Sequence, residues 1–171
     1  YTLILLLALS TLVVGKSDSI RLDFSNKIDA SKFKFRDNSK FNIKFLDVEG
    51  GLSSSYIYSV CEDNNGNIWM STCGGGIMKL DGRNVFVVKM QNGLPGNIVS
   101  DLSCDKEGLI WVTIEGSIYY FDGEFLINKS INSELDDYYL KKIHKYDDEH
   151  LLLVASDSTS FIVNKNEVRY L

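Results

Sequence analysis

Between residues 56 and 90, hydrophobic and polar residues form short runs that are separated by turn-forming residues. The first run, residues 56–62, puts Tyr56, Tyr58 and Val60 on one face and the intervening residues on the other, which is the period of a β-strand. The sequence Asp63-Asn64-Asn65-Gly66 follows and is typical of a tight hairpin. Further runs at 67–72, 77–80 and 85–90 complete the pattern. It predicts a four-stranded antiparallel sheet.

The same pattern is repeated along the chain. Four landmarks, Leu52, Asp63, Gly66 and Trp69, recur 42 residues later as Leu94, Asp105, Gly108 and Trp111. The second copy predicts strands at 98–104, 109–114, 117–121 and 125–129, and a third predicts strands at 138–145, 151–156, 160–164 and 168–171. In the third copy His150 takes the glycine position and Leu153 the tryptophan position. Repeats of about 40 to 50 residues built from short strands are typical of β-propeller blades.

The repeats predict an all-β chain, an incomplete β-propeller of about three four-stranded antiparallel blades of roughly 42 residues each. Residues 52–93, 94–134 and 135–171 form blade 1, blade 2 and a degenerate blade 3. Residues 41–51 align with the last strand of blade 1, so we expect an orphan N-terminal strand, the outer strand of a preceding blade. Residues 16–40 are polar and weakly patterned, which predicts an N-terminal linker with a short strand around Phe33 and Phe35.

The first 15 residues are almost entirely apolar, and the first charge is Lys16. This run is shorter than the roughly 18 to 20 residues that cross a bilayer as a helix, but it fits the core of a secretory signal peptide. We interpret 1–15 as part of a signal peptide and expect the mature protein to be exported. A buried N-terminal helix and a retained membrane anchor are the alternatives.

Composition narrows the function classes. The chain has 171 residues, 44% hydrophobic and 24% charged, which suits one globular domain. Its net charge of −5 and the lack of a basic stripe argue against a nucleic-acid surface. Cys61, Cys73 and Cys104 are an odd number and allow at most one internal disulfide. Because Cys61 and Cys104 occupy different repeat positions, we expect no disulfide framework and a packing role for at least two of the three.

The landmark residues have a structural and a functional interpretation. A tryptophan at one position of two blades favours packing between neighbouring sheets over a platform for sugar stacking. The turn after Asp63 has alternate oxygen ligands, as in a calcium loop, but Ile68 and Gly74 stand where that loop needs glycine and an acid. We therefore assign Asp63, Gly66, Trp69, Asp105, Gly108 and Trp111 to the structural repeat. The sequence predicts no metal and no cofactor.

No catalytic motif is visible. The two histidines, His144 and His150, both lie in the least regular copy, and the chain has no nucleophile elbow or zinc-protease motif. Gly74, Gly75 and Gly76 connect two predicted strands rather than leading into a helix, so they do not predict a phosphate site. We expect this chain not to be an enzyme.

Two segments resemble the two-component regulator propeller repeat: GLSSSYIYSVCEDNNGNIWMSTCGGGIMKLDG and GLPGNIVSDLSCDKEGLIWVTIEGSIYYFDG. They share its Gly-Leu-(Pro/Ser) start, Asp-x-x-Gly turn, (Ile/Leu)-Trp strand and closing Asp-Gly. The third copy departs from the pattern, as does Cys73. The resemblance implies part of a seven-bladed propeller in the exported sensor region of a membrane-bound regulator, often a hybrid histidine kinase. Kinase activity would lie in other domains.

The resemblance implies a periplasmic ligand-sensing segment of a two-component sensor, anchored in the inner membrane as a whole protein, with carbohydrates as the expected ligand. The implied partners are a small molecule or oligosaccharide, the remaining blades, the transducer domains and a second sensor chain in a homodimer. Propeller topology makes loop residues the binding candidates: Ser53, Ser54, Gly74, Gly75, Asn97 and Glu115. An exported propeller lyase or hydrolase and a non-catalytic interaction scaffold are the alternatives.

Overall fold

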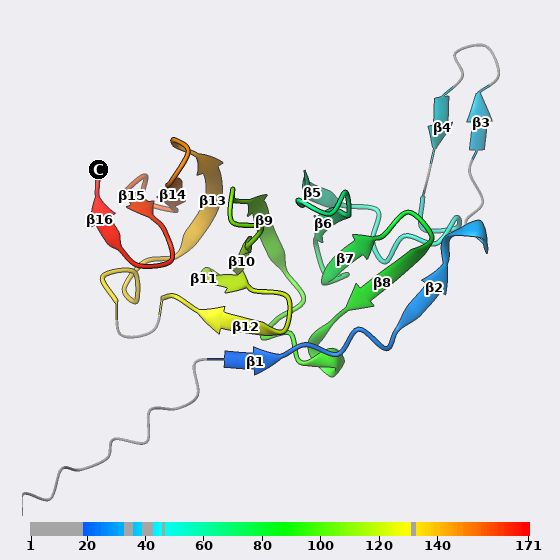
Figure 1. The fold of residues 1–171 in the computed structure, drawn as a ribbon, viewed down its shortest axis with the longest axis horizontal. Coiled ribbons are helices and arrows are strands. Elements are labelled where there is room, and N and C mark those ends of the chain that lie inside the picture. Colours follow the sequence, from blue (N-terminus) through cyan, green and yellow to red (C-terminus); the bar gives the residue numbers. More distant parts are fainter. Residues whose placement is uncertain (1–18, 33–35, 39–42, 46, 131–132) are drawn as a thin grey trace, which may run out of the picture.

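The structure is a computed structural model that describes residues 19–32, 36–38, 43–45, 47–130 and 133–171. The predicted signal peptide and the strand around Phe33 and Phe35 lie outside these residues. The described chain is almost entirely β, with three antiparallel sheets side by side and a separate two-stranded hairpin (Figure 1). Within these residues, no helix is both long enough and apolar enough to cross a membrane.

Each sheet contains one copy of the repeat, as predicted. Blade 1 is β5 (Ile57–Glu62), β6 (Ile68–Thr72), β7 (Ile77–Leu80) and β8 (Asn84–Val88). Blade 2 is β9 (Val99–Cys104), β10 (Ile110–Ile114), β11 (Ser117–Phe121) and β12 (Phe125–Asn128). Blade 3 is β13 (Leu140–Lys145), β14 (Leu151–Ala155), β15 (Ser160–Val163) and β16 (Val168–Tyr170). Consecutive strands pair antiparallel in every blade, so the all-β propeller prediction is confirmed.

The sheets pack face to face, with the first strand of each blade beside the first strand of the next. One apolar core lies between blades 1 and 2 and contains Trp69, and a second lies between blades 2 and 3 and contains Trp111. Side chains of one first strand also bond the backbone of the next. Ser59 Oγ donates to the Leu102 carbonyl oxygen at 3.0 Å, and Asp101 Oδ2 accepts from the Ile143 backbone N–H at 3.1 Å.

The N-terminal segment differs from the predicted linker. β1 (Ser19–Arg21) pairs with β12, and β2 (Lys27–Asp29) pairs with β8, so this segment adds a fifth strand to blade 2 and to blade 1. We call residues 19–32 the strap; it includes the 3-10 turn η1 (Ala30–Lys32) and runs along the outer edges of both sheets in Figure 1. The alternation of Ile20 and Leu22 with polar residues is the sequence pattern that indicates a strand here. The pattern is weak because β1 and β2 are each only three residues long.

The strap is fixed between the two sheets by its apolar side chains. Leu22 is buried in the core between blades 1 and 2, and Phe24 packs against Trp69 and Phe121 with ring centroids 6.1 and 5.5 Å away. The backbone of Asp23 donates to the Asn92 carbonyl oxygen at 2.9 Å. The strap therefore covers two exposed sheet edges and closes the outer side of one interface.

The predicted orphan strand is also different. β4 (Ile43–Phe45) pairs with β3 (Arg36–Asn38) in a hairpin that projects away from the blades in Figure 1. Among the described residues, it does not pair with any of the three sheets. The alignment of residues 41–51 with the last strand of blade 1 reflected a shared strand pattern, and strand pattern alone does not determine the pairing partner.

The expectation for the cysteines is wrong. Cys61 and Cys104 form a disulfide between β5 and β9, with Cα atoms 6.1 Å apart, and Cys73 is free. Successive residues of a strand point to opposite faces of the sheet. Residues at equivalent repeat positions point the same way around the propeller, so a residue of β5 that faces blade 2 meets a β9 residue at a neighbouring position, which faces back toward blade 1. The two cysteines are therefore 43 residues apart rather than 42. Face-to-face packing therefore requires that two cysteines that cross-link adjacent blades occupy different repeat positions.

The strap predicts a specific loss of stability. We expect Leu22→Ala to lower the free energy of unfolding by about 2–3 kcal/mol, because it empties a buried site between two sheets. Arg21→Ala, on the neighbouring exposed position, should change it by less than about 0.5 kcal/mol. Urea unfolding of both variants measures the difference. Equal midpoints would show that the strap does not contribute to the interface between blades 1 and 2.

Candidate functional site

In blades 1 and 2, the aspartate and the tryptophan of the repeat bond to each other. Asp63 Oδ2 accepts from Trp69 Nε1 at 2.8 Å, and Asp105 Oδ2 accepts from Trp111 Nε1 at 2.7 Å. The other oxygen of each carboxylate accepts backbone N–H groups of its own turn. One carboxylate thus shapes the turn and satisfies the only polar atom of the buried indole.

The environment of the tryptophans favours the packing interpretation. Trp69 is 3% exposed and Trp111 is fully buried, so neither ring offers a face to a ligand. Gly66 and Gly108 have φ of 78° and 85°, values that a side chain disfavours, so the glycine belongs to the turn geometry. These landmark residues build the turns and the interfaces of blades 1 and 2.

The turn of blade 3 is shorter than predicted. The Asp63 and Asp105 backbone N–H groups donate to the carbonyl oxygens of Asn67 and Leu109, four residues on, but that of Asp147 donates to His150, three residues on. His150 therefore replaces the residue after the glycine, and the glycine itself is deleted. Trp111 pairs with Ser103, the second-last residue of β9, and Leu152 pairs with His144, the second-last residue of β13. Leu152 rather than Leu153 therefore takes the tryptophan position.

His150 connects two turns of blade 3. Its Nδ1 lies 2.9 Å from Asp147 Oδ1, and its Nε2 lies 2.9 Å from Glu167 Oε1. A protonated imidazole can donate to both carboxylates, whereas a neutral one can donate to only one. Asn67 makes the equivalent contact in blade 1, where its Nδ2 donates to Asp63. The position therefore has a structural role in both blades.

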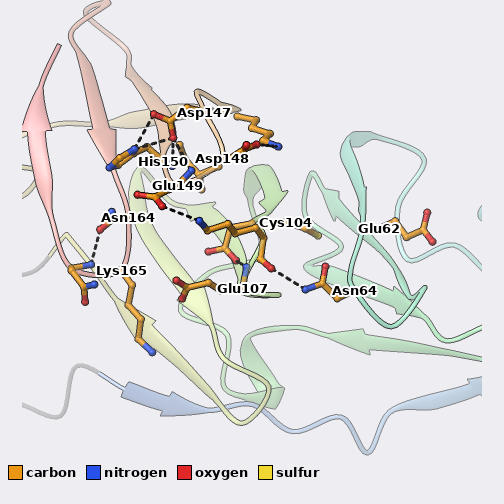
Figure 2. Close-up of a pocket in the computed structure, with 15 residues that line it drawn as sticks. Glu62, Asn64, Cys104, Glu107, Asp147, Asp148, Glu149, His150, Asn164 and Lys165 are labelled. Atoms are coloured by element: carbon orange, nitrogen blue, oxygen red, sulfur yellow. Dashed lines mark hydrogen bonds and ion pairs between the residues drawn. The ribbon is translucent and has the colours of Figure 1, made fainter.

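A polar cavity of about 350 Å³ lies beside these turns and is lined by residues of all three blades (Figure 2). Its lining includes Glu62, Asn64, Lys106, Glu107, Asp147, Asp148, Glu149, His150 and Lys165. Many of its charges pair with one another, as Lys106 with Glu149 at 3.2 Å and Lys145 with Asp148 at 3.1 Å. Among the described residues, no group of three or more His, Cys, Asp or Glu side chains is arranged to hold a metal ion.

The predicted loop residues lie at the opposite end of the blades. We use the name connector end for this end, which contains the connections between blades and the turns between second and third strands. The end with the Asp-containing turns is the hairpin end. Ser54 Oγ donates to the Cys73 carbonyl oxygen at 2.9 Å, and the Gly74 N–H donates to the Asn97 carbonyl oxygen at 3.1 Å. The loops that precede blades 1 and 2 thus meet at one turn.

Gly75 and Ser53 belong to the same cluster. A Cβ at Gly75 would lie 2.6 Å from Ser53 Oγ, so only glycine allows this approach. The Ser53 hydroxyl is buried and has no hydrogen-bond partner among the described residues. Five of the six predicted loop residues, Ser53, Ser54, Gly74, Gly75 and Asn97, are therefore brought together around the turn of blade 1.

Glu115 lies one blade further on, at the same end. Its backbone N–H donates to the Ile98 carbonyl oxygen at 3.2 Å, directly beside Asn97, and its side chain lies over Gly96. Its φ of 49° is unusual for a residue with a side chain, so this backbone conformation has a conformational cost. The Glu115 carboxylate is exposed at this turn. The six residues thus form two adjacent groups. The sequence did not indicate the cavity at the hairpin end, because its residues are spread over four turns.

Residues 51–74 match the family described as two component regulator propeller. These residues resemble one copy of that family's repeat. The matched residues run from the loop before β5 to the turn after β6, so they include Asp63, Trp69 and the Gly74 turn. Among curated protein sequences, none is significantly similar to this chain.

Solved structures share the propeller fold. The extracellular domain described as hybrid two component system BT4673 from B. thetaiotaomicron has a TM-score of 0.60 and 18% identity, covering 89% of this chain and 24% of that chain. The corresponding domain of BT3049 from the same organism has a TM-score of 0.54 and 13% identity, covering 87% of this chain and 27% of that chain. Virginiamycin B lyase from Staphylococcus aureus has a TM-score of 0.54 and 11% identity, covering 67% of this chain and 40% of that chain.

These likenesses concern the fold. The chain spans less than half the length of each of these solved structures, between 24% and 40%. Two proteins with different described roles, a signalling domain and a lyase, share the arrangement of blades, so the arrangement alone does not assign an activity.

The carboxylates in the propeller turns predict a loss of stability in acid. Hydrogen bonds from Asn84 and from the Arg83 backbone lower the pKa of Asp81 from 3.8 to about 2. Burial of Asp63 opposes ionisation, but the bonds from Trp69 and Asn67 outweigh it and lower its pKa as well. Because these values lie below those of the unfolded chain, the stabilisation is complete above about pH 4 and is lost as the pH falls toward the folded-state values.

Urea unfolding between pH 5 and pH 2 measures this dependence. We expect the midpoint to fall steadily below about pH 4, and Asp63→Asn to lose about 1–2 kcal/mol at pH 7 with a shallower pH dependence. Asp148→Asn is the control, since the Asp148 side chain is 89% exposed. Parallel curves for Asp63→Asn and the unsubstituted protein would contradict the role assigned to Asp63.

Proposed function

We propose that this chain is a propeller segment of the exported sensor region of a two-component signalling protein. The match of residues 51–74 to the two-component regulator propeller family is the observation that carries the proposal. The fold shared with extracellular domains of two-component systems from B. thetaiotaomicron supports it. Any kinase activity would belong to other domains of the full-length protein.

The disulfide supports an exported location. Cys61 and Cys104 join the first strands of two blades, and such cross-links persist mainly in oxidising compartments such as the periplasm. The apolar segment at residues 1–15 suits a signal peptide, as the sequence predicts. We therefore place the sensor region in the periplasm, with the full-length protein anchored in the inner membrane.

The proposed sensing site is the connector end. Loops from successive blades meet there, and the Asn97 side chain and the Glu115 carboxylate offer polar groups beside a glycine-rich turn. A ligand that binds one arrangement of the blades and domains more tightly than another would shift the population of the sensor toward that arrangement. We propose a carbohydrate as the ligand and a homodimer as the signalling form.

Binding measurements on the complete exported region test this proposal. We expect titration calorimetry with a panel of neutral and acidic oligosaccharides to find a ligand whose affinity falls at least about tenfold in Asn97→Ala and in Glu115→Ala. Glu107→Ala, at the hairpin end, is the matched control and should leave affinity unchanged. A ligand whose affinity depends on Glu107 and not on Asn97 or Glu115 would move the site to the other end. If no member of the panel bound, carbohydrate sensing would be rejected.

A further inference from the structure

The two ends of the propeller segment differ in the side chains they expose. Met90, Ile98 and Tyr139 in the connecting loops are 58%, 42% and 49% exposed, and Val48 and Tyr56 in the loop before blade 1 are also exposed. In the turns of the hairpin end, Tyr146 is the only exposed large hydrophobic residue among those described. Exposed apolar side chains therefore collect at the connector end.

Three of these residues occupy the same place in successive blades. The carbonyl oxygen of Tyr56 accepts from the Cys73 N–H, that of Ile98 from the Glu115 N–H, and that of Tyr139 from the Ser156 N–H. Each residue immediately precedes the first strand of its blade, and its carbonyl oxygen accepts from the first residue after the second strand. A large exposed hydrophobic side chain thus recurs at one fixed position, beside the innermost strand.

These side chains are presented on ordered backbone. The Met90 N–H donates to Asn97 Oδ1 at 2.9 Å, and the Tyr139 ring lies directly against Gly116, where a Cβ would collide with it. Met90 and Ile98 lie between blades 1 and 2, and Tyr139 lies between blades 2 and 3, so each has described blades on both sides. Their exposure is a property of this end of the segment.

The chemistry of the surface fits a protein partner. Tyrosine and methionine side chains are enriched at the buried centre of protein interfaces, which is also more apolar than the rest of the surface. Carboxylates lie in the same loops and turns: those of blades 2 and 3 at this end contain Glu115, Glu134, Asp136, Asp137 and Asp157. The basic residues there and in the loop before blade 2 are Lys89 and Lys129. A second copy of the same surface would bring like charges together, whereas a basic rim would complement them.

We propose that the connector end docks a folded protein domain with an apolar centre and a rim of lysine and arginine. Ile98 and Tyr139 would pack in the centre of this interface, and Glu115 and Asp137 would pair with the basic rim. The proposal does not depend on the identity of a sensed ligand.

Site-specific photocrosslinking in the full-length protein in its own cells tests the proposal. The probe is benzoylphenylalanine at position 139, with position 146 as the matched control, since both tyrosines are 49% exposed and they lie at opposite ends. We expect position 139 to give crosslinked peptides from one folded domain, with lysine or arginine beside the crosslinked residue, and position 146 to give none. Glu115→Lys combined with Asp137→Lys should lower the yield several-fold.

Other outcomes overturn the proposal. Crosslinks from position 139 to peptides of this same segment would identify a second copy as the occupant. If the charge reversals left the crosslinking yield unchanged, the partner would not have the proposed basic rim. Absence of crosslinks, with the probe shown to be incorporated and the protein folded, would mean that this surface faces solvent. Both proposals use Glu115, but crosslinking at position 139 reports on docking and the titration of Asn97→Ala reports on the sugar site, so failure of one is distinguishable from failure of the other.

Discussion

The structure depends on the face-to-face packing of neighbouring sheets around one buried indole each. Trp69 and Trp111 fill the interfaces between blades 1 and 2 and between blades 2 and 3, and the aspartate of the preceding turn satisfies each indole N–H. A large ring can be buried there only because its single polar atom has a partner. The Asp and Trp positions are therefore linked in the repeat by one hydrogen bond.

The two interfaces are reinforced differently. The interface between blades 1 and 2 has the Cys61–Cys104 disulfide on its inner side and the strap with Leu22 on its outer side. The interface between blades 2 and 3 relies on Asp101, which accepts from the Ile143 N–H and lies 3.7 Å from Lys142 Nζ. Blades 1 and 2 thus form a cross-linked unit, to which blade 3 is joined by packing and polar contacts.

Features that recur could be predicted from the sequence, and features that occur once could not. The 42-residue spacing of Trp69 and Trp111 predicted the blades and the buried indoles correctly, since periodicity reports directly on repeated strands. The strap was missed because three-residue strands leave little pattern around Ile20 and Ile28. The disulfide was missed because a comparison of equivalent positions cannot show which faces of two strands meet. The turn at His150 was misaligned because a deletion within a hairpin is invisible without its hydrogen bonds.

The predicted loop residues illustrate the same limit. Topology placed Ser53, Gly75, Asn97 and Glu115 at one end of the blades correctly, because alternating strand directions determine the end at which each loop lies. Whether they bind a ligand depends on chemistry that the loops alone do not define. Ile98 and Tyr139, which lie beside them, are exposed at the same end.

Peptide mapping of the unreduced protein tests the face-to-face packing most directly. The account predicts that the peptide with Cys61 is linked to the peptide with Cys104, and that Cys73 is recovered as a free thiol, because only the first strands of adjacent blades bring the first two together. A link from Cys73 to either of the other cysteines would contradict the packing of the sheets. So would three free thiols in protein folded under oxidising conditions.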